Sequence, residues 1–312
     1  MITENLQKNF LEEVTCDLCG SADYKIIYPS LYRDEDLAKD LSHSFLYAAG
    51  DRARGNIVRC RHCGLVYATP RDKNVAAIYE NSADDNFYLR TGAERKEAFV
   101  CLLDELEVIS GLAEKRGKLL DVGCGYGFFL DIAKERGWEE YGCELGRNQS
   151  SFAAKNHSRV FNKELSDCGF PENFFDAIAL YDVLEHLTSP SAFIKIIRKI
   201  LKTEGWLVIN MPNFSSWSSK IMGRFWHGLA RMHLYYFTPK TIRKFLSENN
   251  FKIVKITPHK MVIRLGAVVE WAKKFPAMYK LLNFLFNNRF LGNIKIKTSF
   301  GGNNMIIYAR KG

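Results

Sequence analysis

The run LLDVGCGYGFFLDIA at residues 119–133 constrains the fold most. Its first residues are apolar, as in a buried strand, and its last residues have the apolar spacing of a helix. Between them Gly123, Gly125 and Gly127 stand at alternate positions. Glycine permits backbone conformations and close approaches that other residues do not. The run therefore predicts a strand, a tight turn and a helix, with a ligand held against bare backbone at the turn.

Beyond Gly117, short strand-like runs alternate with helix-like runs. This alternation predicts an α/β fold with a parallel sheet, helices on both faces and a ligand crevice at the carboxyl ends of the strands. Thr238-Pro239 predicts the start of a helix, because a hydroxyl caps well and proline suits the first turn. The expected strands are 118–122, 139–144, 158–162, 174–181, 205–211, 251–257 and 304–310.

The glycine spacing and one nearby acid indicate which ligand the turn holds. A dinucleotide fingerprint is G-x-G-x-x-G, whereas this chain has G-x-G-x-G with Asp121 two residues ahead. A carboxylate there would repel a pyrophosphate and attract a cation, and S-adenosylmethionine carries an ammonium and a sulfonium. Glu144, at the end of the next expected strand, can accept two ribose hydroxyls. Glu144 alone does not discriminate, since nicotinamide cofactors are held in the same way.

Several separated segments resemble the class I S-adenosylmethionine-dependent methyltransferases over about residues 117–312. LLDVGCGYG is similar to their first motif, GFPENFFDAIALYDVLEHL (169–187) to their fourth strand and turn, and HLYYFTPKTIRKFLSENNFKIV (233–254) to the region of their sixth strand. The terminal NNMIIYARKG resembles their last, antiparallel strand. The resemblance implies a Rossmann-like sheet of seven strands with the last one antiparallel.

The same resemblance implies a set of cofactor contacts. The acid and glycines of the first motif would surround the methionine part, Glu144 the ribose, and Tyr181 with Asp182 would lie beneath the methionine. Glu164 would take the adenine amino group and the Leu165 backbone N–H would face the ring, although the family usually has Asp there and Asp167 is the substitute. The expected set is Asp121, Gly123, Cys124, Gly125, Gly127, Glu144, Leu145, Glu164, Leu165, Tyr181 and Asp182.

Two C-x-x-C-G turns near the start, CDLCG and CRHCG, have the form of zinc knuckles. Four thiolates suit a closed tetrahedral zinc site, so Cys16, Cys19, Cys60 and Cys63 are the expected ligands. Disulfides are the alternative, but we expect none, because the N-terminus lacks the apolar core of an export signal. The module lacks the density of basic residues typical of nucleic-acid binding. Such Cys-pair modules ahead of this domain resemble methyltransferases proposed to act on sugars or cell-surface glycans.

We therefore predict three parts. Residues 1–80 would form the zinc-binding module with an insertion between the knuckles, and 81–116 a helical linker. Residues 117–312 would form the methyltransferase domain, with a basic, helical insertion near its C-terminus. No apolar run reaches the roughly 18–20 residues that span a bilayer, so a cytoplasmic location is expected.

A hydroxyl acceptor benefits from a positioned base, most often histidine. His186 and His233 are the candidates, with a purely structural role as the alternative for each. Four aromatic residues between them, Phe214, Trp217, Phe225 and Trp226, could stack on a sugar. The string D-x-x-E-H ending at His186 resembles a metal-binding E-x-x-E-H of some methyltransferases. The first acid of the string is aspartate here, which is shorter than the glutamate of the metal-binding form. Methyltransferases without metal contain the same string, so a second metal is not expected.

The positive charge gathers at one end of the chain. The net charge is +9, and residues 251–312 hold 12 lysines and arginines against one acid, Glu270. This end could meet an anionic membrane, a phosphorylated acceptor or nucleic acid, or only solvent. The apolar face of 277–291 suits a packed helix or, as the alternative, a helix lying on a membrane near a lipid-linked acceptor.

The sequence therefore predicts an S-adenosylmethionine-dependent methyltransferase with structural zinc. Its expected acceptor is a hydroxyl of a sugar, glycan or related small molecule. RNA methylation is one alternative, although the N-P-P-Y motif of base aminomethylating enzymes is missing. A non-catalytic cofactor-binding module is the other.

Overall fold

The computed structural model describes residues 11–32, 54–73, 89, 92–114, 116–259, 261–264, 279–280, 283, 295–298 and 303–312. The expected insertion between the knuckles and nearly all of the expected helix at 277–291 lie outside these residues.

A seven-stranded sheet forms the centre of the molecule, in the order β12-β15-β10-β9-β6-β7-β8. Strand β15 runs antiparallel to both of its neighbours, and the other pairs are parallel. This confirms the seven-stranded prediction with an antiparallel last strand. The bounds are β6 Lys118–Val122, β7 Glu139–Cys143, β8 Val160–Phe161, β9 Phe175–Tyr181, β10 Leu201–Pro212, β12 Phe251–Pro258 and β15 Asn304–Lys311.

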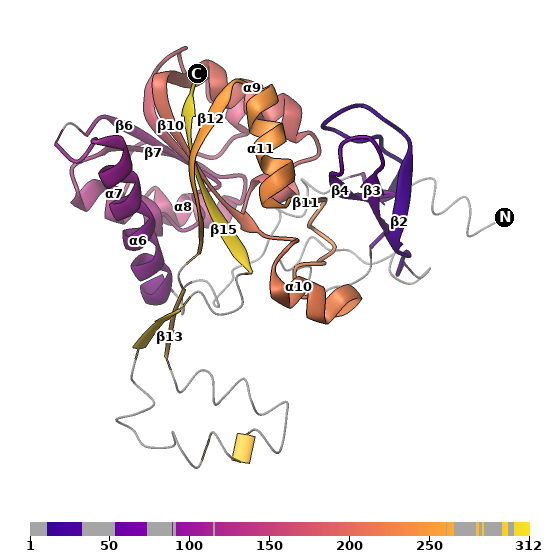
Figure 1. The fold of residues 1–312 in the computed structure, drawn as a ribbon. Helices are drawn as coiled ribbons and strands as arrows, with labels where there is room; N and C mark the ends of the chain where they lie inside the picture. The colour runs from indigo at the N-terminus through magenta and orange to yellow at the C-terminus, as the bar shows by residue number, and fades with distance from the viewer. Residues whose placement is uncertain are drawn as a thin grey trace.

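Helices cover both faces of this sheet (Figure 1). Successive side chains of a strand point to opposite faces. Leu119 of β6 therefore packs with α6 (Gly92–Ser110) and α7 (Phe128–Glu135), whereas Leu120 packs with α9 (Pro190–Ile200) and α11 (Pro239–Glu248). Helix α11 starts at a Thr238 cap with proline in its first turn, as predicted. A further helix, α8 (Arg147–Ala153), follows β7.

A second, four-stranded sheet has the order β11-β4-β3-β2. The first cysteine pair precedes β2, and the second lies at the end of β3 and in the turn to β4. Strands β2 (Tyr24–Tyr28), β3 (Asn56–Cys60) and β4 (Val66–Thr69) come from the N-terminal part, but β11 (Tyr235–Tyr236) comes from the segment before α11. β11 pairs antiparallel with β4. The sheet beside α9 and α11 in Figure 1 is therefore built from two distant parts of the chain.

Shorter elements complete the structure. Strands β1 (Leu11–Glu12) and β5 (Arg71–Asp72) pair with each other, as do β13 (Met261–Arg264) and β14 (Lys295–Thr298). Helix α10 (Trp217–Met222) is followed by the 3-10 turn η3 (Gly223–Phe225), and two similar turns, η1 (Leu165–Asp167) and η2 (Leu184–His186), lie beside the sheet.

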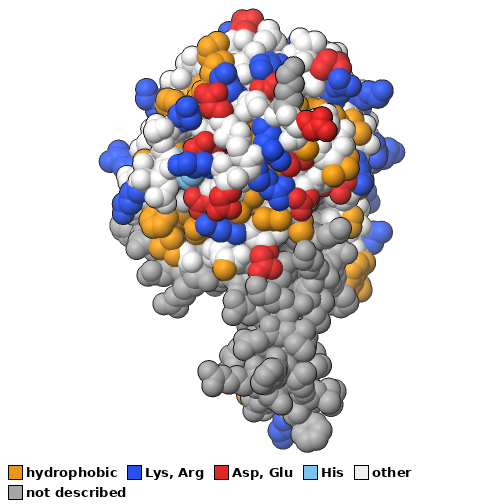
Figure 2. Space-filling model, turned by 90° about the vertical axis from the view of Figure 1, so that its left-hand side faces the viewer, with side chains coloured by type: hydrophobic (Ala, Val, Ile, Leu, Met, Phe, Trp, Pro, Cys, Tyr) orange, Lys and Arg blue, Asp and Glu red, His pale blue; other side chains and the backbone are white. Residues whose placement is uncertain are grey.

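The surface of the described part gives two further observations. Figure 2 shows lysine and arginine side chains interspersed with aspartate and glutamate on the face that it presents. That face has no extended field of one sign where the structure is described. Among the described helices, none has the length and apolar character to cross a membrane.

Candidate cofactor and acceptor site

The glycine turn lies between β6 and α7 and has the conformation that only glycine adopts easily. Gly123, Gly125 and Gly127 have φ of 71°, 52° and 81°, in the left-handed region that costs other residues energy. The N–H groups of Gly123 and Cys124 donate to the Cys143 carbonyl, at 2.8 and 3.1 Å. These bonds fix the turn to the end of β7. A Cβ on Gly123 would lie 2.8 Å from Val183 Cγ2, whereas one on Gly125 would meet nothing within 4 Å.

Two carboxylates stand at this turn, Asp121, which is buried, and Glu144, which is half-buried. Glu144 follows β7, and its two oxygens accept hydrogen bonds from the N–H groups of Gly125 (2.9 Å) and Gly146 (2.7 Å). Burial raises the pKa of Glu144, and these backbone donors oppose the rise. Asp121 is 3% exposed, and burial together with the Glu144 charge raises its pKa well above the usual range. A bound cation would lower the pKa of both groups again, because it favours the ionised carboxylates.

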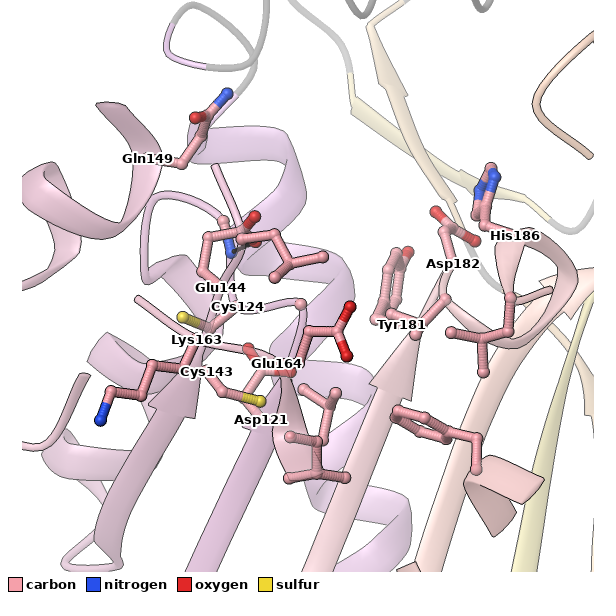
Figure 3. A pocket seen from close by; sticks show the side chains of 18 of the residues that line it. Asp121, Cys124, Cys143, Glu144, Gln149, Lys163, Glu164, Tyr181, Asp182 and His186 are labelled. Carbon is pink, nitrogen blue, oxygen red and sulfur yellow. Dashed lines mark hydrogen bonds between the residues drawn. The ribbon is translucent and has the colours of Figure 1, made fainter. Parts of the chain in front are cut away.

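A cavity of about 470 Å³ opens over the carboxyl ends of the strands. Figure 3 shows Asp121 and Glu144 in one part of it and Tyr181, Asp182 and His186 in another. Gly127 does not line it; this glycine precedes α7 instead. Glu164 lines it and its substitute Asp167 does not. The residues predicted to bind cofactor that do line it are Asp121, Gly123, Cys124, Gly125, Glu144, Leu145, Glu164, Leu165, Tyr181 and Asp182.

The end of β9 positions Tyr181 and Asp182. The Tyr181 ring packs edge-on against Phe99, with centroids 4.7 Å apart, and its hydroxyl lies 2.8 Å from His259 Nε2. Asp182 has φ 55° and accepts hydrogen bonds from Asn210 (2.6 Å) and Asn304 (3.2 Å). Asp182 is exposed and lines the cavity. The protein around its carboxylate reduces its solvation, which raises its pKa to about 6, and Arg95 and Asn210 oppose the rise.

Two further residues lie at or beside this site, Arg95 and His259, and the sequence predicted neither as a cofactor contact. Arg95 lies on α6, in the expected linker helix, and lines the cavity. His259 follows β12 and contacts the cavity residue Tyr181. Burial followed by the Arg95 charge lowers the pKa of His259 to about 4. No local pattern marks either residue, because Arg95 lies on the helix before the glycine turn and His259 lies 78 positions beyond Tyr181.

A second cavity, of about 190 Å³, adjoins the first, and Asp182 and His186 line both. It also brings together Glu185, His186 and His233, which each offer one ligand atom within 4.8 Å of the others. The structure therefore places the two predicted bases side by side, with ring centroids 4.6 Å apart. His233 comes from the loop after α10 and His186 from η2.

Hydrogen bonds fix the tautomers of both rings. His186 Nδ1 lies 3.0 Å from the Met232 carbonyl and His233 Nδ1 lies 2.7 Å from the Gly228 carbonyl. A carbonyl only accepts, so each Nδ1 carries the proton and each neutral Nε2 carries a lone pair. Burial lowers the pKa of His186 well below its usual range and lowers that of His233 to about 4. Both rings are therefore neutral at pH 7.

Glu185 completes this cluster. It is 2% exposed, and among the described residues neither of its carboxylate oxygens has a hydrogen-bond partner, although His186 Nε2 lies 4.0 Å from one of them. Burial and the Asp182 charge raise the pKa of Glu185 well above its usual range. A buried carboxyl group without partners is costly for stability. Such a group in a cavity is typical of a functional site, where a proton, a substrate or a cation satisfies it.

The four N-terminal cysteines form a separate, compact cluster. All four sulfurs lie within 4.8 Å of one another, with Cys16 to Cys63 at 3.4 Å and Cys19 to Cys60 at 3.5 Å. Each of the four is a free thiol. Tetrahedral zinc at about 2.3 Å from each sulfur sets the sulfurs roughly 3.8 Å apart. The donor set therefore fits zinc, and the expectation of free thiols rather than disulfides agrees with the structure.

The stacking role predicted for Trp226 is wrong. Trp226 is 1% exposed, and it packs in a small core with the half-buried Phe214 at a centroid distance of 6.0 Å. The Trp226 ring is therefore not available to an acceptor. Trp217 and Phe225 are exposed, at 49% and 57%, but neither lines the two cavities.

Comparison with known proteins identifies a methyltransferase domain in this chain. A family described as "Methyltransferase domain" matches residues 93–256, a little over half of the chain. The chain is 28% identical over 179 residues to the mitochondrial ubiquinone biosynthesis O-methyltransferase of Dictyostelium discoideum, which covers 49% of this chain and 54% of that protein. It is 30% identical over 141 residues to phosphoethanolamine N-methyltransferase of Triticum aestivum, covering 42% and 26%.

The chain spans about half the length of the first of these curated relatives. Among solved structures, a SAM-dependent methyltransferase from Archaeoglobus fulgidus matches with a TM-score of 0.49 and 22% identity, covering 73% of this chain and all of that one.

The chain belongs to this methyltransferase family. This membership agrees with the resemblance of its motifs to the class I S-adenosylmethionine-dependent methyltransferases.

Proposed function

We propose that this methyltransferase methylates a hydroxyl group of a polar small molecule, with sugars and glycan intermediates as the first class to test. The observation that carries the proposal is the second cavity, which shares Asp182 and His186 with the cofactor cavity. Its polar lining of acids, histidines and Asn304 suits a hydroxylated acceptor. Such an acceptor would meet the methyl group where the two cavities join.

The cofactor would lie across the glycine turn. We propose that Glu144 takes the ribose, Glu164 and the Leu165 backbone the adenine, and Asp121 the cationic methionine end. Arg95, on the cavity wall, suits the methionine carboxylate. The bound cofactor supplies an activated methyl group on a sulfonium. The protein then mainly aligns the acceptor oxygen and excludes water.

Methylation of an alcohol requires removal of its proton. The new O–C bond forms as the C–S bond breaks, the sulfur keeps the electron pair, and the hydroxyl proton goes to the enzyme. We propose that Glu185, His186 and His233 receive this proton as a group. A histidine with a pKa near 4 is a weak base by itself, whereas the buried carboxylate beside it has a raised pKa.

The same three residues favour a second candidate, a divalent cation. Two imidazoles and a carboxylate are common ligands of such metals, and each Nδ1–H donating to a carbonyl is the usual outer contact of a ligating histidine. The unpartnered oxygens of Glu185 fit this role. A cation held there would lower the pKa of a coordinated hydroxyl. Asp182, the first acid of the D-x-x-E-H string, accepts hydrogen bonds from Asn210 and Asn304 instead. The sequence predicted no second metal, so this candidate rests on the structure.

For the N-terminal module we propose that Cys16, Cys19, Cys60 and Cys63 hold structural zinc. The support is the closeness of the four sulfurs and the absence of a disulfide among the eight cysteines. A closed shell of four thiolates leaves no position for substrate, so this metal would stabilise the fold.

A methyl-transfer assay tests the acceptor. Cofactor with a labelled methyl group is incubated with small-molecule, glycan-lipid and RNA fractions of a cell extract. We expect label in the small-molecule fraction. Label in RNA, lost at moderate salt, would instead support the RNA alternative. Cofactor binding without transfer to any fraction would support a non-catalytic module.

Substitutions and chelation then distinguish the two roles proposed for Glu185, His186 and His233, proton acceptance and cation binding. Glu185→Gln should lower turnover by about 10²–10⁴-fold, with unchanged cofactor affinity, whereas His227→Asn in the same cavity is the matched control. The second, divalent cation is established if a chelator abolishes turnover while the zinc content stays at one per chain, and Mn²⁺ then restores turnover. Turnover that survives complete chelation would establish the proton role.

A further inference from the structure

The first cysteine knuckle is hydrogen-bonded to the start of helix α9 through Asp17. Asp17 stands between Cys16 and Cys19 in the knuckle turn. Its carboxylate accepts hydrogen bonds from the Ser191 N–H (2.7 Å) and the Ser189 hydroxyl (3.0 Å). Its backbone carbonyl accepts a third from the Ser191 hydroxyl, at 2.8 Å. These bonds join residues more than 170 positions apart.

Asp17 acts as the cap of helix α9. The residue at the usual cap position, Ser189, makes no capping bond of its own, and Pro190 at the first turn has no N–H. The Ser191 N–H is therefore the first free donor of the helix, and Asp17 satisfies it. A carboxylate at this end also interacts favourably with the helix dipole. A cap of this kind contributes roughly a tenfold or smaller change in helix stability.

The start of α9 forms one wall of the cofactor cavity. Leu187, Thr188, Ser189, Ala192 and Phe193 all line it. The segment that Asp17 holds is therefore the segment that the cofactor would contact. η2, with Glu185 and His186, immediately precedes this wall.

A second connection runs from the same module to the same wall. The Tyr235 hydroxyl donates to the Thr188 carbonyl at 3.2 Å and accepts from Arg71 at 3.1 Å. Tyr235 lies in β11, which pairs with β4 of the cysteine sheet. Cys16 and Cys60 belong to one apolar core with Ile194 and Ile197 of α9. The module and this wall therefore pack as one body.

We infer that zinc occupancy of the four-cysteine site and cofactor binding are coupled, with Asp17 as the positioning residue that connects them. The metal would hold Cys16 and Cys19 in place, and these two residues bound the turn that carries Asp17. Asp17 in turn holds residues 187–193, which form one wall of the cofactor cavity. If zinc raises cofactor affinity, linkage requires that the cofactor raises zinc affinity by the same factor. The inference rests on the proposed zinc site and is independent of the acceptor.

Binding of S-adenosylhomocysteine, measured by calorimetry on zinc-loaded and zinc-free chains, tests the coupling. We expect zinc removal to weaken binding to the wild type by about 5-fold or more, the lower end of typical coupling. Zinc-loaded Asp17→Ala should show a similar loss and little further loss on zinc removal. Asp17→Asn should fall between the two, because its amide oxygen still accepts from Ser191. Zinc content and near-UV circular dichroism are recorded for every sample.

Asp23→Ala is the matched control, because Asp23 lies in the same module and contacts Arg61 instead of α9. It should bind like the wild type. Folded, zinc-loaded Asp17→Ala and Asp17→Asn that bind within twofold of the wild type would overturn the inference. Equal sensitivity of Asp17→Ala and the wild type to zinc removal would also overturn it. A chain that takes up no zinc would refute the zinc site, and the coupling with it.

Discussion

Replacing Glu144 with glutamine changes one atom at the centre of the cofactor site. Both oxygens of Glu144 accept a backbone N–H, one from Gly125 in the glycine turn and one from Gly146. Glutamine has only one acceptor oxygen, so one of these N–H groups would face an amide NH₂. Hydrogen bonds to a charged group contribute about 1.5–3 kcal/mol. The proposed ribose contact loses its charge in the same step.

We expect Glu144→Gln to weaken binding of S-adenosylhomocysteine by about 10- to 100-fold, since 1.4 kcal/mol corresponds to a factor of ten. Calorimetry measures the affinity, and chemical denaturation separates it from stability. Glu139→Gln is the control, because Glu139 begins the same strand and its side chain is 38% exposed. A folded Glu144→Gln that binds within twofold of the wild type would refute the reasoning.

Three further predictions address pH, metal and packing. Cofactor affinity should be highest above the Asp182 pKa of about 6 and should fall as the pH drops through this value, because the cationic cofactor favours ionised Asp182 and Asp121. Titration calorimetry at several pH values measures this affinity. An affinity that does not change with pH would show that these acids do not contact the cofactor. The purified chain should hold one zinc ion, and removal of this zinc by a chelator should lower the melting temperature. Elemental analysis of the Cys60→Ser variant should show that the zinc is lost. An unchanged zinc content in this variant would contradict the proposed ligand set. Leu103→Ala, at a fully buried position where α6 packs on the sheet, should lower the free energy of unfolding by about 3 kcal/mol; a loss under 1 kcal/mol in urea denaturation would show that α6 is loosely attached.

The strands could be predicted because their signals are local. Each of the seven expected runs overlaps an observed strand, since apolar runs bounded by turn residues need no distant information. The start of β10 differs, at Leu201 instead of 205, because the strand continues directly from α9 and its register shifts between Leu201 and Trp206. The glycine turn and its acids were found for a similar reason. They follow directly after strands whose ends meet at one edge of the sheet.

The remaining features depend on contacts between distant segments. Nothing near Tyr235 indicates that it pairs with Tyr67, and nothing near Asp17 indicates that it caps α9. The two histidines were chosen separately, yet their meeting with Glu185 depends on how the loop after α10 folds back. The stacking role predicted for Trp226 failed because an aromatic residue in a loop can pack into a small core as readily as it can face a ligand. The three-part division of the chain stays a prediction.

A crystal structure with bound S-adenosylhomocysteine tests the central claim most directly. The account predicts the ribose at Glu144, the adenine beside Glu164 and Leu165, and the sulfur facing the junction of the two cavities between Asp182 and His186. A ligand bound elsewhere, or one whose sulfur faces away from Asp182 and His186, would contradict the proposed path of the methyl group.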